Sequence, residues 1–265
     1  YAKANGGKFI LRVEDTDKQR SERQFEEKQI EDLKWLGIDY DEGPAIGGEY
    51  GPYRQSERLD IYGKKAQDLI TEEKAFYCFC SDEELTEKKE RARAEGRPPH
   101  YDGKCRNLTQ EQALNRLAGG EKAVVRFKAP HKSYAFHDLV RQRVVFPEGM
   151  VGDFVILRSD GMPVYNYCCT VDDMMMEISH VFRAEEHLPN TLRQLMIYEA
   201  FGAKAPEFGH LSLLIGKDRQ KLSKRHGATS VGQFKEENYY PEAMVNYLTL
   251  LGWSHPDEKD IFDLE

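Results

Sequence analysis

The strongest constraint on the fold is an alternation of short apolar runs with amphipathic helical patterns. "KFILRV", residues 8–13, follows a Gly-Gly break and has the length of a strand buried on both faces of a parallel sheet. Residues 21–36 then place apolar side chains on one helical face, and Gly37 ends that helix. The order of strand, loop and helix predicts an α/β fold built on a parallel sheet.

The same alternation returns twice further along the chain. A second helix is predicted over residues 56–75, and the apolar run "AFYCFC" follows it. "SHVFRAEEH" reads as a short strand that runs into charged residues, before a helix over 188–201 that Gly202 stops. "FGHLSLLIG", residues 208–216, is another candidate for a buried strand.

The pattern changes between these α/β stretches. Ser81 and Glu84 form a capping box at the start of a charged helix, which stops at Gly96 before two prolines. Short strands follow in "AVVRFK" and in "DFVILRSDGMPVYNY", where Asp160-Gly161 predicts a hairpin. A helix followed by short antiparallel strands indicates an inserted α+β module.

The last part of the chain is predicted to be helical. Beyond Thr229, Pro241 lies at the first turn of a helix with an apolar stripe that ends before Gly252. The chain therefore divides into a first α/β half at 1–78, an insert at 79–155, a second α/β half at 156–228, and the start of a helical module at 229–265.

Charge is distributed unevenly. The formal net charge is −8, but residues 88–143 contain 14 Lys or Arg against 6 Asp or Glu, which gives +8 for this segment and −16 for the remainder. A basic region inside an acidic chain favours a partner with a polyanionic backbone. The alternative is a solvated helix face of mixed charge.

Other features of the sequence exclude whole classes. No apolar run approaches the roughly 18 residues that span a bilayer, and "YAKANGGK" has no signal-peptide pattern, so we expect a cytoplasmic protein without a membrane partner. The 5 cysteines are too few and too unevenly placed for a disulfide scaffold. We expect reduced thiols or metal ligands.

The basic loop "KLSKR" carries Lys221 and Lys224 three positions apart, after a predicted strand. Two ammonium groups held in this way can be directed at one phosphate chain. Phosphoryl and adenylyl transfer need fixed positive charge because negative charge builds on the leaving pyrophosphate. Without its context, such a loop is more often a solvated basic turn.

The context comes from several stretches read together. "RVEDTD", "GPYRQSER", "GMPVYNY" with "VDD", "VFRAEEH" and "KLSKRHG" occur in the order and spacing typical of glutamyl-tRNA synthetases. The chain resembles that family of class I aminoacyl-tRNA synthetases over essentially its whole length. "KLSKR" corresponds to the signature loop named KMSKS. The resemblance implies a Rossmann-type catalytic domain, an inserted module that binds the tRNA acceptor end, and a helical stem-contact module.

The resemblance also implies the chemistry. Glutamate and ATP, the latter with Mg²⁺, would form glutamyl-adenylate and pyrophosphate, and the glutamyl group would pass to tRNA(Glu). Lys221 and Lys224 would hold the ATP phosphates as the catalytic pair. The expected ATP-binding set is Glu186, His187, Leu214, Lys221, Ser223, Lys224 and Arg225. We expect a monomer.

The residues also suit glutamate as the amino acid. Arg183 would pair in a bidentate way with the side-chain carboxylate, as Arg does and Lys does not. Glu14 would bind the substrate ammonium, with Asp17 as the alternative for that role, and Tyr165 would hydrogen-bond beside it. Cys169 stands where the family often has Asn, which puts that one contact in doubt.

A second departure is the missing "HIGH" signature, which in the family lies upstream of the position of Tyr1. We interpret the sequence as an excerpt that begins one strand and one helix late. Two alternatives stay open: a glutamyl-Q tRNA-modifying synthetase, and a non-catalytic RNA-binding paralogue. The intact "KLSKR" loop argues against both, and the helical module after Thr229 argues against the first.

The insert contains a cysteine cluster. Cys78 and Cys80 are followed after 24 residues by Cys105, and structural zinc requires four N or S ligands in a tetrahedron, of which only three are obvious here. Some family members complete the set with a His at the position of Asn107, which is a poor ligand. Glutamyl-Q synthetases use Tyr followed four residues later by Cys, and the resemblance of "YDGKC" to that pattern implies zinc bound by Cys78, Cys80, Tyr101 and Cys105. The alternative is a metal-free knuckle of reduced thiols.

Overall fold

The computed structural model describes residues 1–16, 23–216, 218–222 and 230–262. Contacts divide the chain into two compact units. The first unit comprises residues 1–53, 182–187 and 210–265, and the second comprises residues 54–181 and 188–209. The four-part division predicted from the sequence follows motifs rather than contacts, and its boundaries stay a prediction.

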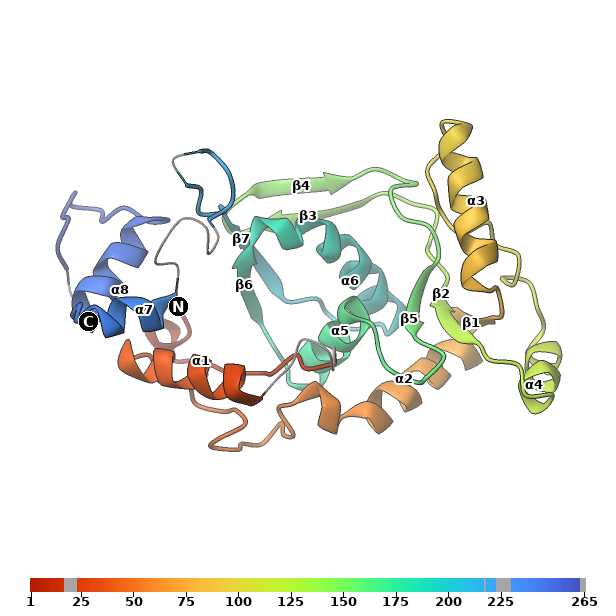
Figure 1. Cartoon of the computed structure of the whole chain (residues 1–265), viewed down its shortest axis with the longest axis horizontal. Coiled ribbons are helices and arrows are strands. Elements are labelled where there is room, and N and C mark those ends of the chain that lie inside the picture. The colour runs from red at the N-terminus through yellow and green to blue at the C-terminus, as the bar shows by residue number, and fades with distance from the viewer. Residues whose placement is uncertain (17–22, 217, 223–229, 263–265) are drawn as a thin grey trace. The chain divides into compact units, whose positions relative to one another are not determined.

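Helices and strands are interspersed along the chain (Figure 1). The α-helices are α1 (Arg23–Trp35), α2 (Leu59–Thr71), α3 (Asp82–Ala94), α4 (Gln110–Ala118), α5 (Tyr165–Met175), α6 (Leu188–Ala200), α7 (Val231–Glu236) and α8 (Pro241–Leu250). The strands are β1 (Ala75–Cys78), β2 (Val124–Phe127), β3 (Tyr134–Asp138), β4 (Gln142–Phe146), β5 (Phe154–Leu157), β6 (His180–Ala184) and β7 (Glu207–Leu211). Short 3-10 helices cover Lys3–Asn5 (η1), Gln55–Glu57 (η2) and Glu185–His187 (η3).

The strands form two sheets. β1, β2 and β5 make an antiparallel sheet in which β2 is central. The other sheet has the order β4-β3-β7-β6, with β3 and β4 antiparallel and β3 and β7 parallel. This mixed sheet, together with the helices, confirms the predicted α/β class. β6 and β7 each begin in the second unit and end in the first.

The core of the second unit lies between α2, α5, α6 and the strands. α5 and α6 pack against each other, and α2 contacts α5 (Figure 1). The apolar positions spaced at three and four residues on each helix face inward, because only that face can be removed from water. The fully buried members include Tyr62, Leu69, Tyr167, Val171, Ile197, Phe127 and Ile156.

A buried ionic network ties α5 to the segment that precedes α2. Asp172 is fully buried and accepts hydrogen bonds from Arg58 Nε at 2.7 Å, from Gln55 Nε2 at 2.9 Å and from the Tyr62 hydroxyl at 2.7 Å. A buried charge is tolerated only when it is paired and hydrogen-bonded, and this carboxylate meets both conditions. "RQSER" and "VDD", two of the motifs that carried the resemblance, therefore meet in the interior.

The first unit has a smaller core, made by Leu36, Met244 and Val245 with partly buried neighbours such as Phe234. α8 begins with Pro241 at its first position, as predicted, since Pro lacks the amide hydrogen that this position would leave unpaired. α1 and α7 contact each other within this unit.

Residues 8–13 do not form the predicted strand. Ile10 makes an isolated parallel bridge to Glu42, Leu11 donates to the Glu42 carbonyl, and Val13 donates to the Tyr53 carbonyl. Between these two partners the chain contains four glycines and two prolines, which interrupt a regular ladder. The segment is extended, but its hydrogen bonds go to two separate points.

The turn of the hairpin predicted at Asp160-Gly161 is confirmed, but its second strand does not form. The turn forms, with Gly161 at φ +82° and Arg158 N–H donating to the Met162 carbonyl at 2.8 Å. The second arm stops after one bridge from Leu157 to Pro163, because α5 begins at Tyr165. One more hydrogen bond joins the arms, from Val164 N–H to the Ile156 carbonyl at 2.9 Å, before the helix turns the chain away.

None of the helices in the described ranges is long and apolar enough to cross a bilayer.

Candidate functional site

Arg183, predicted to bind the amino-acid side chain, lies near the end of β6. Its side chain is partly buried, and its Nε–H donates to Nε2 of His210 at 3.1 Å. His210 belongs to the neighbouring strand β7 and is 0% exposed. Contact with a buried ring on the next strand fixes the orientation of the guanidinium.

Glu186 and Lys221, both predicted to bind ATP, form an ion pair. Lys221 Nζ lies 2.6 Å and 2.8 Å from the two carboxylate oxygens of Glu186. The hydrogen bond from Lys221 lowers the pKa of Glu186, and the charge of His187 adds to this effect. Because η3 follows β6 directly, Glu186 and His187 come three and four positions after Arg183.

Leu214 and Lys221 lie on the two arms of a small hairpin. Leu222 N–H donates to the Leu214 carbonyl at 2.9 Å, and Ile215 bridges to Lys221. Glu185 accepts a hydrogen bond from the Leu213 amide at 3.1 Å, which ties η3 to the base of this hairpin. The chain thus brings Leu214, Glu186 and Lys221 together.

Ser223, Lys224 and Arg225 lie outside the described residues, as does Asp17, the alternative to Glu14. Their predicted roles stay predictions.

Glu14 follows the extended segment 8–13 and is exposed. Its carboxylate accepts from Arg12 Nη2 at 3.1 Å. Tyr165 begins α5 in the second unit, one helical turn before Cys169. Cys169 is buried, with its sulfur 3.9 Å from an oxygen of Asp173.

Three cysteines and a tyrosine converge beside β1. The sulfurs of Cys78, Cys80 and Cys105 all lie within 4.8 Å of one another, and those of Cys80 and Cys105 are 3.8 Å apart. The Tyr101 hydroxyl lies 3.4 Å from the Cys78 sulfur and 3.5 Å from the Cys80 sulfur. Asn107, by contrast, is exposed.

These distances can be compared with a tetrahedral zinc site. With Zn–S of about 2.3 Å and Zn–O of about 2.0 Å, tetrahedral angles put two sulfurs about 3.8 Å apart and a sulfur and an oxygen about 3.5 Å apart. The Cys80–Cys105 separation and the two S–O separations agree with these values. The donor set therefore fits a four-coordinate structural metal.

Burial and mutual contacts shift the pKa values of the residues in this cluster. Burial raises the pKa of Cys80 to about 12, and the Cys78 and Cys105 sulfurs add to the rise. Burial and the three cysteines also raise the pKa of Tyr101. Burial opposes ionisation of Cys78 too, but hydrogen bonds from Tyr101 and from backbone, together with Arg126, lower its pKa overall. Arg126 stacks over the Tyr101 ring, with its Cζ 4.2 Å from the centroid.

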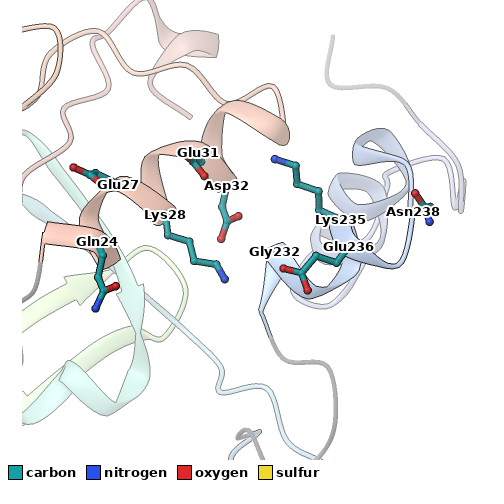
Figure 2. Close-up of a pocket in the computed structure, with 9 residues that line it drawn as sticks. All are labelled: Gln24, Glu27, Lys28, Glu31, Asp32, Gly232, Lys235, Glu236 and Asn238. Carbon is teal, nitrogen blue, oxygen red and sulfur yellow. The ribbon is translucent and has the colours of Figure 1, made fainter.

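Two clefts are lined by residues other than those predicted to bind glutamate and ATP. One of about 550 Å³ lies between α1 and α7 in the first unit, where charged side chains face one another (Figure 2). Its four carboxylates outnumber its two ammonium groups, so it does not suit the phosphates of ATP. The other, of about 430 Å³, lies beside α3 and is lined by Lys88, Arg91, Arg97 and His100.

Sequence reasoning missed two residues that contact the predicted ones. His210 appeared only as one letter in a strand candidate, and Asp172 only as part of a motif. Both make their key contacts with residues distant in the sequence, 27 positions away for Arg183 and His210 and 114 for Arg58 and Asp172. The only local signal for His210 was its position as a polar residue inside an apolar strand run.

Comparisons with known proteins were consistent with this geometry. The glutamate--tRNA ligase of Carboxydothermus hydrogenoformans is 56% identical over 100% of this chain and 55% of its own length. That of Natranaerobius thermophilus is 52% identical over 99% of this chain and 54% of its own length. The chain therefore spans about half the length of the curated relatives it matches.

Among solved structures, a crystal structure of a glutamate tRNA ligase from Elizabethkingia meningosepticum in complex with its amino acid superposes with a TM-score of 0.89. It is 38% identical and covers 99% of this chain and 57% of that one. Residues 1–265 also match the family described as "tRNA synthetases class I (E and Q), catalytic domain". The fold and these matches agree: the chain belongs to the class I tRNA synthetases of the E and Q group.

Proposed function

We propose that this protein is a glutamate–tRNA ligase. In the first step, the α-carboxylate of L-glutamate attacks the α-phosphorus of ATP, which gives glutamyl-adenylate and releases pyrophosphate. In the second, a hydroxyl of the terminal adenosine of tRNA(Glu) attacks the acyl carbon and AMP leaves. The names of the relatives, at 52% and 56% identity, support this reaction over the two alternatives.

Glutamate is selected by charge in this proposal. Arg183 pairs with the side-chain carboxylate, Glu14 receives the ammonium group, and Tyr165 adds a hydrogen bond. A guanidinium held in a partly buried site rejects glutamine, because the amide would leave the cation unpaired. The fixed orientation of Arg183 on His210 supports this role.

The observation that carries the proposal is the contact between Lys221 and Glu186. It joins the signature loop to η3, which directly follows the strand that holds Arg183. ATP bound at Glu186, His187 and Leu214 would bring its phosphates to Lys221 and Lys224, with Ser223 and Arg225 in the same loop. Lys221 would then exchange one anionic partner for another. Mg²⁺ bound with ATP would neutralise further phosphate charge.

The insert at 79–155 is proposed to bind the acceptor end of tRNA, mainly through phosphates. The cleft lined by Lys88, Arg91, Arg97 and His100 supports this role. Two of these side chains already pair with carboxylates of α3, Lys88 with Glu84 and Arg91 with Glu87. Phosphate contacts of this kind position a nucleic acid without reading its sequence.

Zinc is proposed to hold the base of the insert, bound by Cys78, Cys80, Tyr101 and Cys105. A closed site with four protein ligands stabilises the fold and has no open position for catalysis. Arg126 would offset part of the negative charge of three thiolates and a phenolate.

The test of the function is ATP–pyrophosphate exchange by the complete gene product, with tRNA present. We expect exchange that depends on L-glutamate and that L-glutamine does not support. Binding of tRNA without any exchange would favour a non-catalytic RNA-binding paralogue instead.

A further inference from the structure

The buried histidine of β7 has no role in the reaction as described above. His210 is 0% exposed, and its neighbours Phe208 and Gly209 on the same strand are also buried. The polar ring of a fully buried histidine must be satisfied within the protein. One of its contacts is the hydrogen bond to Arg183, with 3.1 Å between Nε2 and Nε.

The direction of this hydrogen bond fixes the state of the ring. The guanidinium can only donate, so Nε2 of His210 must accept, and the ring is neutral with its proton on Nδ1. A charged imidazole could not accept, and it would place a second cation beside the first.

The bond also selects which edge of Arg183 is offered to a carboxylate. A guanidinium can pair in fork geometry through its two terminal nitrogens, or through Nε and one terminal nitrogen. Because Nε–H is committed to His210, the fork must use Nη1 and Nη2.

We propose that His210 is a positioning residue for amino-acid selection: it holds the Arg183 guanidinium so that the two terminal nitrogens meet the side-chain carboxylate of glutamate. This inference rests on the proposed function. It assigns part of the specificity to a residue that does not touch the substrate.

The test compares two substitutions in the complete protein. His210→Leu removes the acceptor but keeps an apolar filler, whereas His210→Gln keeps an oxygen close to the position of Nε2. In pyrophosphate exchange we expect His210→Leu to raise KM for glutamate about ten- to a hundredfold, the usual effect of losing one hydrogen bond to a charged group. His210→Gln should stay within about threefold of the wild type, and KM for ATP should change in neither.

A matched control is available on the neighbouring strand. His180 on β6 is partly exposed and lies 3.8 Å from Glu207 on β7. His180→Leu should leave KM for glutamate unchanged. Urea midpoints of all variants, measured alongside, show whether a rise in KM reflects lower stability of the protein or weaker binding of glutamate.

The outcomes separate this inference from the proposed function. The role of His210 alone would be overturned by an unchanged KM for glutamate in His210→Leu. It would also be overturned if KM rose equally in the Leu and Gln variants and the rise matched the fall in their urea midpoints. Calorimetric binding of glutamate covers the case without exchange. If the wild type shows no exchange but binds glutamate, and His210→Leu binds it more weakly, the ligase is refuted and the inference stands. If the wild type neither exchanges nor binds glutamate, both are overturned.

Discussion

The buried carboxylate of Asp172 should be one of the most sensitive points of the fold. The side chains of Arg58 and Asp172 are 2% and 0% exposed, so neither can exchange its partner for water. Asp172→Asn removes the charge but keeps the shape. It removes the negative charge that faces the buried Arg58 guanidinium, and loss of one charge of a buried pair costs about 3–5 kcal/mol.

That loss is a large part of the roughly 5–15 kcal/mol that holds a domain together. With a urea slope of about 3 kcal/mol per molar, the midpoint should fall by about 1–2 M. Urea titration followed by far-UV circular dichroism measures this shift directly.

An exposed ion pair provides the matched control. Arg91 and Glu87 are 2.7 Å apart on α3, with side chains 63% and 70% exposed. Glu87→Gln should cost no more than about 0.5 kcal/mol, because water screens the pair. Adding Arg58→Met to Asp172→Asn should recover much of the loss, since no buried charge is then left alone and the amide oxygen can still accept from Gln55 and Tyr62. If Asp172→Asn costs no more than Glu87→Gln, the reasoning is refuted.

Three further predictions concern the zinc site, the pH dependence and the RNA. Purified protein should contain about one zinc per chain, and Cys105→Ser should lose it while Cys168→Ser, outside the cluster, keeps it; wild-type protein without zinc contradicts the site. Hydrogen bonds from Lys8 and Tyr53 lower the pKa of Glu42 from 4.5 to about 2. The contribution of ionised Glu42 to the free energy of unfolding is therefore complete above pH 4.5 and is lost as the pH falls from 4.5 to about 2. Glu42→Gln should therefore flatten the loss of stability in that range, and an unchanged pH profile would disprove the linkage. Affinity for tRNA should fall steeply with salt, and Lys89→Ala should reduce the slope of log K against log salt by about one; salt-insensitive binding would argue against phosphate contacts.

Local signals in the sequence were enough for most helices. Ser81 accepts a hydrogen bond from the Glu84 amide at the start of α3, and Gly37 and Gly202 take positive φ after α1 and α6, as their positions predicted. These features depend on residues within one or two helical turns. α4 was missed even though Thr109 and Gln112 form a capping box, because its apolar stripe is short.

Features that depend on distant residues were not predictable in the same way. Residues 8–13 have the composition of a strand, but their partners lie on either side of a loop rich in glycine and proline. The α5 helix contains two cysteines and two aspartates in its interior, and its position depends on contacts with Arg58 and Tyr62. The substrate residues came from the family resemblance, and the residue that orients Arg183 came only from the structure.

Selection of glutamate by Arg183 can be tested by comparing kcat/KM for glutamate and glutamine in pyrophosphate exchange, for wild type and Arg183→Gln. We expect the wild type to prefer glutamate by roughly 10⁴-fold, as polar mismatches in a buried site can reach. Arg183→Gln should lose most of its activity with glutamate while activity with glutamine stays the same or rises. A variant that keeps the wild-type preference for glutamate would show that another group reads the carboxylate.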